Sequence, residues 1–198
     1  MKHDKRSARM LQIEEAAYVL IQEKGYASTS MLNIAKRAKA SNETLYNWYG
    51  DKLGLFHSMV ESNAKKVSSV LQEAIEKNAD PIETLVLFGT ALLEMLTGDR
   101  AVALNRAAAA DASGTLGKAL AIAGRDAVAP LIGRTLEQAK QAGALRFSDT
   151  QSATELYLNL LIGDMQLRCV TGQIAPPNAT ARSARAYRAA TLLQKLLD

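Results

Sequence analysis

The sequence of this 198-residue chain predicts an all-α fold. Apolar residues recur at spacings of three and four along most of the chain, and no stretch shows the alternation of apolar and polar residues that is typical of a half-buried strand. Capping residues and glycines divide the chain into segments of helical length. We expect a three-helix unit at residues 1–52 and a larger helical bundle at residues 53–198.

The first helix is expected at residues 7–24, where apolar residues form one helical stripe and Gly25 follows as a C-terminal cap. The basic arm before it, at residues 2–9, is expected to be mobile. It is either a source of additional phosphate contacts or a solvated tail. The cations of this arm are Lys2, Lys5, Arg6 and Arg9.

Residues 29–52 predict two short helices joined by a tight turn. Ser41 can cap the second helix at its N-terminus, and Gly50 can close its C-terminus. A projection at 100° per residue places Leu45 and Tyr49 on one side of this helix and leaves a polar and aromatic outer face. The arrangement indicates a helix-turn-helix whose second helix reads DNA.

The outer face of the second helix supplies the candidate DNA contacts. Amide and hydroxyl groups there can hydrogen-bond base edges or phosphates, and the aromatic residues Tyr46 and Trp48 can donate to phosphate oxygens. Glu43 either stabilises the helix N-terminus or accepts a hydrogen bond from cytosine N4. The amide and hydroxyl side chains are those of Asn42, Thr44 and Asn47.

These residues resemble the N-terminal domain of the TetR family of transcriptional regulators over about the first quarter of the chain. The matching positions are Gly25-Tyr26, Thr29-Ser30, Ile34-Ala35, Ala38, Ser41, Thr44-Leu45-Tyr46, Tyr49 and Lys52. The resemblance implies that Thr29, Ser41, Tyr46 and Lys52 grip the DNA backbone, while Asn42, Glu43 and Asn47 face the bases. The complete expected DNA-binding set is Thr29, Ser30, Lys39, Ser41, Asn42, Glu43, Thr44, Tyr46, Asn47, Trp48 and Lys52.

Lys39 departs from the family pattern, which has glycine in the turn. A non-glycine residue at positive φ costs about 1 kcal/mol. Either the turn is reshaped, or the cost is accepted because it places a cation beside the phosphates.

Composition excludes several classes of site. The 24 Lys and Arg against 20 Asp and Glu give a net charge of only +4, but residues 1–52 hold nine cations and six acids, so the surplus is concentrated there. A single cysteine, Cys169, precludes an internal disulfide, and neither it nor His57 belongs to a metal-ligand or catalytic pattern. We expect no catalytic residue, metal or cofactor. With no signal peptide or membrane span recognised, we expect a cytoplasmic protein.

Asp51 can cap a long helix that runs to about Asn78 and connects the two parts of the chain. Asp80 and Pro81 then open a helix that is apolar almost all round, which places it at the centre of a bundle. Shorter helices are expected at 100–111, 115–123 and 126–142.

Pro130 should end or bend a helix near Ala129, unless it lies in the first turn of the later segment. One helix from Asp149 to about Thr171 and a last helix at 180–197 complete the bundle. Arg182, Arg185 and Arg188, spaced by three, are expected on a solvated face of that last helix.

The resemblance implies that the last two long helices pair with their copies in a second subunit. The residues alone do not distinguish this pairing from the alternative that these helices only complete the core of the monomer. A homodimer would present two recognition helices to a two-fold operator. The expected interface residues are Ala153, Leu160, Gly163, Leu167, Ala184, Tyr187, Thr191 and Leu192.

Relatives in the family hold a small inducer in the C-terminal bundle, so the resemblance implies an apolar ligand pocket with a few polar anchors. The alternative for each residue is an ordinary packed core. The expected lining is Leu85, Phe88, Leu92, Met95, Leu104, Leu156, Tyr157, Leu160 and Met165, with Asn105, Asp164 and Arg168 as polar anchors.

We therefore expect a ligand-responsive transcriptional regulator, and specifically a repressor that a small, largely apolar effector releases from a two-fold DNA operator. A DNA-binding protein without sequence preference or effector is the first alternative. A helical-bundle ligand carrier or enzyme is the more distant one.

Overall fold

The computed structural model describes residues 2–198, with side chains from Lys5 onward. The described residues form helices and no β-strand, which confirms the all-α prediction. The helices are α1 (Lys2–Lys24), α2 (Met31–Arg37), α3 (Asn42–Tyr49), α4 (Lys52–Glu76), α5 (Pro81–Thr97), α6 (Asp99–Ala109), α7 (Thr115–Leu120), the π-helical turn η1 (Ala121–Arg125), α8 (Asp126–Gln141), α9 (Thr150–Ile162), α10 (Met165–Val170) and α11 (Ala179–Leu196).

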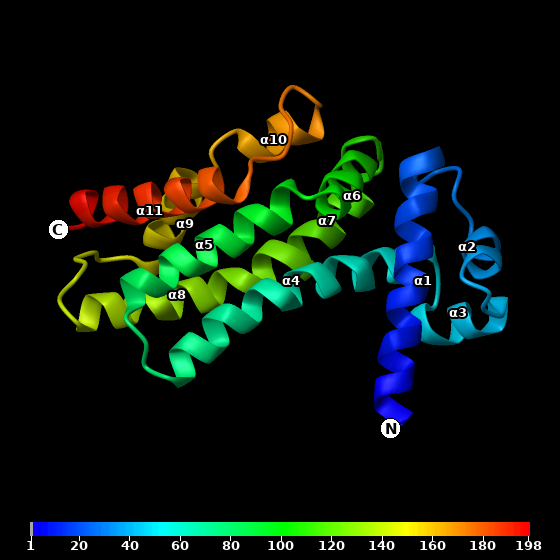
Figure 1. Ribbon diagram of the computed structural model, residues 1–198, viewed down its shortest axis with the longest axis horizontal. Coiled ribbons are helices and arrows are strands. Elements are labelled where there is room, and N and C mark those ends of the chain that lie inside the picture. The colour runs from blue at the N-terminus through cyan, green and yellow to red at the C-terminus, as the bar shows by residue number, and fades with distance from the viewer. Residues whose placement is uncertain (1) are drawn as a thin grey trace.

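Helices α1, α2 and α3 form a head at one end of an elongated molecule, and the C-terminus lies at the opposite end (Figure 1). Helix α4 leaves the head and runs along a bundle made with α5, α8, α9 and α11. Helices α6 and α7 lie between the head and the bundle. The long connecting helix expected after Asp51 is confirmed.

Side-chain caps fix several helix starts where the sequence predicts them. Ser41 Oγ accepts a hydrogen bond from Thr44 N at 3.0 Å, and Asp51 Oδ1 accepts one from Gly54 N at 2.7 Å. Asp80 Oδ1 does the same for Glu83 N at 2.7 Å. Each cap satisfies a backbone N–H that has no partner within its helix, so short polar residues locate these ends.

Helix α1 begins earlier than predicted. It starts at Lys2 instead of Ser7, so the segment expected to be a mobile arm is helical. Arg9 from this segment donates hydrogen bonds to Gln12 and to the carbonyl of Lys39. The prediction for the side chain of Lys2 lies outside the described side chains.

Pro130 does not end a helix near Ala129. The proline is the fifth residue of α8, and the helical path continues through it. The turn η1 immediately before α8 is wider, because the N–H of Asp126 donates to the carbonyl of Ala121, five residues back. We attribute this change of register to the proline, which has no N–H and whose ring presses on the preceding turn.

The single helix expected from Asp149 to Thr171 is broken into α9 and α10. Gly163 at the break has φ 51° and ψ −128°, a conformation that glycine adopts readily. A Cβ atom on Gly163 would lie 2.7 Å from Nη2 of Arg185, and Nε of the same arginine donates to the carbonyl of Leu161. Arg185 thus caps the end of α9 and holds the break in place.

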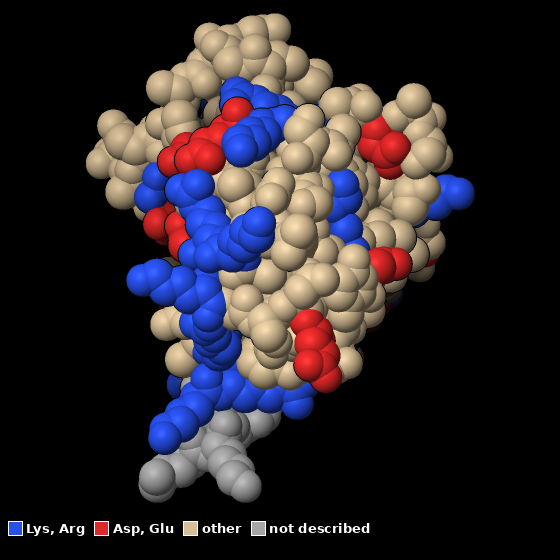
Figure 2. All heavy atoms as spheres, turned by 90° about the vertical axis from the view of Figure 1, so that its right-hand side faces the viewer, with Lys and Arg blue, Asp and Glu red and all other residues tan. Residues whose placement is uncertain are grey.

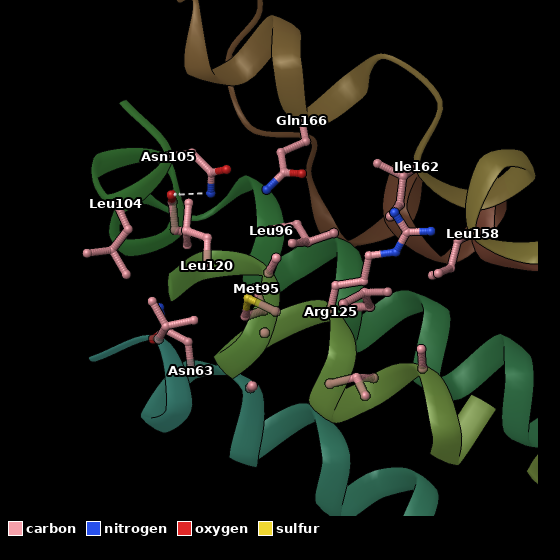
Figure 3. Close-up of a pocket in the computed structure, with 18 of the residues that line it drawn as sticks. Asn63, Met95, Leu96, Leu104, Asn105, Leu120, Arg125, Leu158, Ile162 and Gln166 are labelled. Atoms are coloured by element: carbon pink, nitrogen blue, oxygen red, sulfur yellow. Dashed lines mark hydrogen bonds between the residues drawn. The ribbon is translucent and has the colours of Figure 1, made fainter. Parts of the chain in front are cut away.

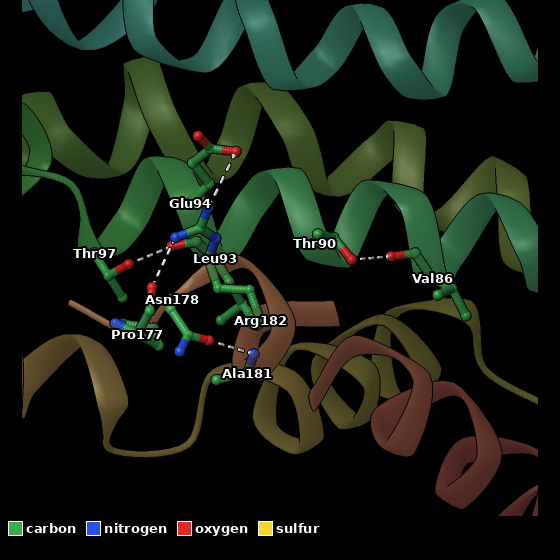
Figure 4. A network of polar contacts seen from close by, with 9 residues as sticks. All are labelled: Val86, Thr90, Leu93, Glu94, Thr97, Pro177, Asn178, Ala181 and Arg182. Carbon is green, nitrogen blue, oxygen red and sulfur yellow. Dashed lines mark hydrogen bonds and ion pairs between the residues drawn. The ribbon is translucent and has the colours of Figure 1, made fainter. Parts of the chain in front are cut away.

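The stripe of three arginines is not a shared solvated face. Arg182 has a side chain only 17% exposed and donates to the carbonyl of Pro177 at 2.7 Å, while its other nitrogen lies 3.7 Å from Glu94 of α5 (Figure 4). Asn178 beside it caps α11 by accepting from Ala181 N at 2.9 Å. Of the three arginines, only Arg188 is exposed. Arg185 holds the end of α9, and Arg182 holds the loop before α11.

Two hydrophobic cores meet along α4. Leu55 and Met59 in its first half pack with α1, α2, α3, α6 and α7, whereas Val67 and Leu71 in its second half pack with α5, α8, α9 and α11. The central position predicted for α5 is confirmed by its packing against α4, α8, α9 and α11.

Among the described helices no single one is long and apolar enough to cross a membrane; α5 and α6 pass that test only as a pair bent by 59°.

Helix α5 approaches α9 and α11 closely at Gly89. A Cβ atom there would lie 2.8 Å from the hydroxyl of Tyr157 and 3.2 Å from the Cβ of Ala186. The Tyr157 hydroxyl is fully buried and donates to the carbonyl of Leu85 at 2.6 Å. Burial without a nearby positive charge raises the pKa of Tyr157, so the hydroxyl remains a donor.

We expect Gly89→Ala to destabilise the protein by about 1–3 kcal/mol, because the added methyl overpacks this contact. Gly117→Ala is the matched control, since Gly117 also lies in a helix but a Cβ there meets nothing within 4 Å. The control should gain up to about 1 kcal/mol from helix propensity. Urea unfolding of both variants checks this, and equal shifts would contradict the packing argument.

A buried carboxylate joins the head to α4. Glu14 of α1 is 3% exposed, and its Oε1 accepts hydrogen bonds from Ser58 at 3.0 Å and from Ser62 at 3.1 Å. Burial raises the pKa of Glu14 despite these two hydrogen bonds and the positive charge of Arg100. The ionised carboxylate therefore costs stability that the protonated form does not.

We expect Glu14→Gln to be more stable than the wild type at pH 7. The folded pKa is raised, so the folded state loses stability as pH rises from near the ordinary value of 4.5, and the variant is spared this loss. The difference should shrink as pH falls toward 4.5. Urea unfolding from pH 4.5 to 7 measures it, with Glu76→Gln, at an exposed position of α4, as control; a gap that does not depend on pH would contradict this.

Candidate nucleic-acid interface and ligand cavity

Helix α3 is fixed by one buried side and presents the other. Leu45 is fully buried and Tyr49 nearly so, in the core formed with α1, α2 and α4. This confirms the orientation predicted from helical periodicity. The exposed residues of the helix are Asn42, Glu43, Tyr46 and Asn47, and Thr44 and Trp48 are half-buried beside them.

The turn between α2 and α3 is held in a strained conformation. Lys39 has φ 51°, so the positive φ expected for the missing glycine is present, and its exposed side chain lies in the turn. The guanidinium of Arg9 donates to the Lys39 carbonyl and supports this conformation from α1. Ser30 caps α2 by accepting from Asn33 N at 3.2 Å, and the hydroxyls of Ser41 and Thr44 are 2.7 Å apart.

Thr29 and Lys52 face into the protein. The buried hydroxyl of Thr29 donates to the carbonyl of Gly25 at 2.8 Å. Lys52 Nζ donates to the carbonyls of Tyr26 and Thr29, each at 2.9 Å, and lies 4.3 Å from the centroid of the Tyr26 ring. Burial lowers the pKa of Lys52. The two residues hold the α1–α2 loop, and their contact with DNA stays a prediction.

The head carries the positive charge that DNA contact requires. Figure 2 views this end and shows a band of Lys and Arg side chains running down one edge, with acidic side chains beside the upper part of the band. Arg6 of α1 lies 5.3 Å from the ring of Trp48, so α1 contributes a cation next to α3. The exposed cations of the described head include Lys5, Arg6, Lys36, Arg37 and Lys39.

A cavity of about 400 Å³ lies beside the head, between α4, α5, α6, η1, α8, α9 and α10 (Figure 3). Four of the residues expected to line a pocket lie in its wall, namely Leu92, Met95, Leu104 and Asn105. The remaining eight expected residues lie outside it. A second hollow of about 620 Å³ lies between α1 and α6, with Ala107 and Ala110 in its wall.

The eight residues outside the cavity have other places in the fold. Three of them, Leu85, Phe88 and Tyr157, belong to the packed core of the bundle. Leu156, Leu160 and Met165 are half-buried, and the exposed Asp164 and Arg168 form a loose pair at 4.0 Å. The break at Gly163 turns α10 away from the line of α9. A projection that assumes one unbroken helix to Thr171 therefore assigns the wrong face of α10 to the pocket.

The sequence prediction missed the wall made by η1. Its wider turn contributes Ala121, Gly124 and Arg125, and Gln166 reaches the cavity from α10 (Figure 3). The nearest signal in the sequence is Pro130, because a proline within a helical segment can signal an irregular turn just before it. The prediction also missed Asn63 of α4, because it considered only the apolar residues of that helix face.

The residues expected at a dimer interface are divided. Ala153 is buried inside this chain, whereas Leu167 and Tyr187 have 64% and 67% of their surface exposed. Gly163 forms the α9–α10 break described above, and Ala184 is exposed on α11. Leu160, Thr191 and Leu192 are half-buried. Exposed apolar surface on α10 and α11 is thus present where a partner helix is expected.

The described residues hold no cluster of three His, Cys, Asp or Glu side chains that could bind a metal ion. Cys169 is buried, and burial raises the pKa of its thiol despite the neighbouring Arg168. The resulting thiol is a poor nucleophile.

Two protein-family models match this chain. Residues 13–59 match the model for "Bacterial regulatory proteins, tetR family". Residues 83–194, more than half of the chain, match "AefR-like transcriptional repressor, C-terminal domain". The first match covers the head, and the second covers most of the bundle.

Among curated proteins, YvkB of Bacillus subtilis, named as an uncharacterised HTH-type transcriptional regulator, is 31% identical over 84 residues, which are 42% of this chain and 43% of that protein. The HTH-type regulator HbdR of Aromatoleum sp. is 32% identical over 77 residues, 39% of this chain and 34% of its own length. The chain therefore spans less than half the length of these two relatives.

The similarity to solved structures extends over the whole fold. A TetR transcriptional regulator from Agrobacterium tumefaciens has a TM-score of 0.75 and 26% identity, covering 96% of this chain and 94% of that one. FadR from Bacillus subtilis, solved with stearoyl-CoA, has a TM-score of 0.75 at 17% identity, covering 95% and 99%. The chain belongs to the TetR family of bacterial transcriptional regulators.

Proposed function

We propose that this protein is a ligand-responsive DNA-binding repressor. The observation that carries the proposal is that one helix, α4, belongs to both the head core and the cavity wall. Val60 of α4 packs in the head core and also lines the cavity, and Leu104 of α6 does the same. A ligand in the cavity therefore touches elements that support α3.

The mechanism is a coupled equilibrium between head positions. Two heads at the correct separation read adjacent major grooves of an operator through α3. A ligand that binds better when the heads are separated differently lowers the affinity for DNA by its differential affinity for the two states. Solved relatives support a small-molecule effector, since one is titled a flavonoid-responsive regulator and another was solved with lauroyl-CoA.

We propose a homodimer acting in the cytoplasm, with residues 1–52 as the DNA-binding domain and 53–198 as the effector-binding and dimerisation domain. The exposed Leu167 and Tyr187 support a partner on α10 and α11. A two-fold operator with half-sites about 34–36 Å apart is the expected target. The exposed Asn42, Glu43 and Asn47 would face its bases, while Ser30, Ser41, Tyr46 and Trp48 would contact its backbone.

The first test is binding to the DNA immediately upstream of the protein's own gene, against shuffled DNA of equal length, over a salt series. We expect a preference of about a thousandfold or more that resolves to a two-fold site. Asn47→Ala should alter base preference, because its amide faces the bases, and Tyr46→Phe should weaken binding to all sequences alike. Lys195→Ala, a cation at the far end of α11, is the control.

Equal and steeply salt-dependent binding to both DNAs would instead indicate a DNA-binding protein without sequence preference. No binding even at low salt would exclude the proposed function. Unchanged affinity and sequence profile in Asn47→Ala and Tyr46→Phe would exclude α3 as the reading helix.

Lys39 offers a separate test, because its backbone strain lowers the stability of the protein while its charge would raise the affinity for DNA. Lys39→Gly should stabilise the protein by about 1 kcal/mol by relieving the positive φ. It should also weaken operator binding and reduce the salt slope by about one. Asn78→Gly is the matched control, since Asn78 is the other non-glycine residue with positive φ among those described, at 48°. That control should leave DNA binding unchanged; a wild-type salt slope in Lys39→Gly would rule out the phosphate contact.

A further inference from the structure

We propose that the cavity binds a small aliphatic carboxylate, with its hydrocarbon chain in the apolar interior and its carboxylate at Arg125. This rests on the proposed function, because it assigns a chemical class to the effector of the same site. Four features carry it: the side chains of the wall, the position of Arg125, the polar groups opposite, and the size of the space.

The wall is aliphatic and has no negative charge. Among the described residues that line the cavity, none is aromatic and none is Asp or Glu, while Arg125 is the single cation. The interior surface comes from side chains such as Leu92, Met95 and Ile132. A flat aromatic ligand is usually held by aromatic side chains, and a cationic ligand by acidic or aromatic ones, so this wall fits neither. It suits an aliphatic chain with an anionic end.

Arg125 is placed to bind the anionic end of such a ligand. It is the last residue of the π-helical turn η1, and Figure 3 shows its side chain directed toward Leu158 and Ile162 of α9. Its only ion-pair partner among the described residues is Glu155, at 3.8 Å, with side chains 63% and 50% exposed. An ion pair this open is worth little, so a ligand carboxylate can replace Glu155 at modest cost. π-helical turns also occur frequently at functional sites.

Amide side chains supply further polar contacts. Asn63, Asn105, Asn159 and Gln166 lie in the wall. Asn105 donates to the carbonyl of Ala101 at 2.8 Å, so this amide is already oriented, whereas Gln166 reaches in from α10 toward the side of Asn105 and Leu96 (Figure 3). The Gln166 amide can donate to a carboxylate oxygen, as can the guanidinium of Arg125.

The volume limits the size of the ligand. A water molecule takes about 30 Å³ in the liquid, so a space of about 400 Å³ accommodates roughly a dozen non-hydrogen atoms. Decanoate is of this size. A long acyl chain attached to coenzyme A exceeds this space and would have to leave its nucleotide outside the cavity. The free acid therefore fits better than the thioester.

The experiment is calorimetric titration of the full chain without DNA, using the straight-chain carboxylates from hexanoate to tetradecanoate below their micellar concentrations. Affinity should rise roughly fourfold per methylene until the cavity is filled near decanoate, and then fall. Decan-1-ol and decyltrimethylammonium are the matched uncharged and cationic probes. Both should bind more weakly than decanoate.

Variants separate the carboxylate contact from the chain contact. Arg125→Gln should weaken decanoate binding about tenfold and leave decan-1-ol unchanged, while Arg125→Lys restores part of the loss. Arg134→Gln, an exposed arginine on α8 outside the cavity wall, is the control. Ala129→Leu in the wall should move the optimum to shorter chains, whereas Ala110→Leu in the second hollow should not. Thermal unfolding without ligand verifies that each variant folds.

Absence of decanoate binding would overturn the proposal, as would equal affinity for decanoate and decan-1-ol, or an Arg125→Gln loss shared by both. These outcomes are distinguishable from failure of the proposed function. A chain that prefers its upstream DNA but does not bind decanoate refutes only the ligand class. A chain that binds decanoate through Arg125 but treats all DNA alike refutes the repressor and retains the carboxylate site.

Discussion

The continuity of α4 is the constraint on which the rest of the structure depends. Its first half buries Leu55 and Met59 in the head, and its second half buries Val67 and Leu71 in the bundle, so neither core is complete without it. The buried Glu14 adds a polar tie from α1 to Ser58 and Ser62 on the same helix. In the proposed mechanism, α4 would therefore carry a displacement in the bundle into the head.

Two irregular stretches of helix border the cavity. The π-helical turn η1 widens the path before Pro130 and directs Arg125 to the wall, and the break at Gly163 lets α10 fold back over the opening. Regular helices at both places would pack closely, as α5 does against α9 and α11 at Gly89. Space for a ligand and tight packing thus lie on neighbouring stretches of the same bundle, and Arg185 holds the break at Gly163 in position.

Much of the fold follows from local chemistry in the sequence. The caps Ser41, Asp51 and Asp80 fix helix starts within a residue, since each satisfies an N–H that otherwise lacks a partner. Periodicity alone orients α3, because a helix of eight residues must bury Leu45 and Tyr49 to be stable. The candidate DNA face is therefore predictable, whereas the inward positions of Thr29 and Lys52 depend on carbonyls of a loop whose path the sequence does not reveal.

The sequence by itself determined the helical class, the order of the helices, most of their ends and the exposed face of α3, because these depend on neighbours along the chain. Tertiary structure decided which apolar residues enclose a cavity and which fill a core. Leu92 and Phe88 look alike in sequence, yet only Leu92 lines the space. Likewise Arg182 and Arg185 are buried or used as caps because α5 and α9 pass beside them. Such choices depend on how helices distant in sequence cross, and spacing along one helix does not encode that.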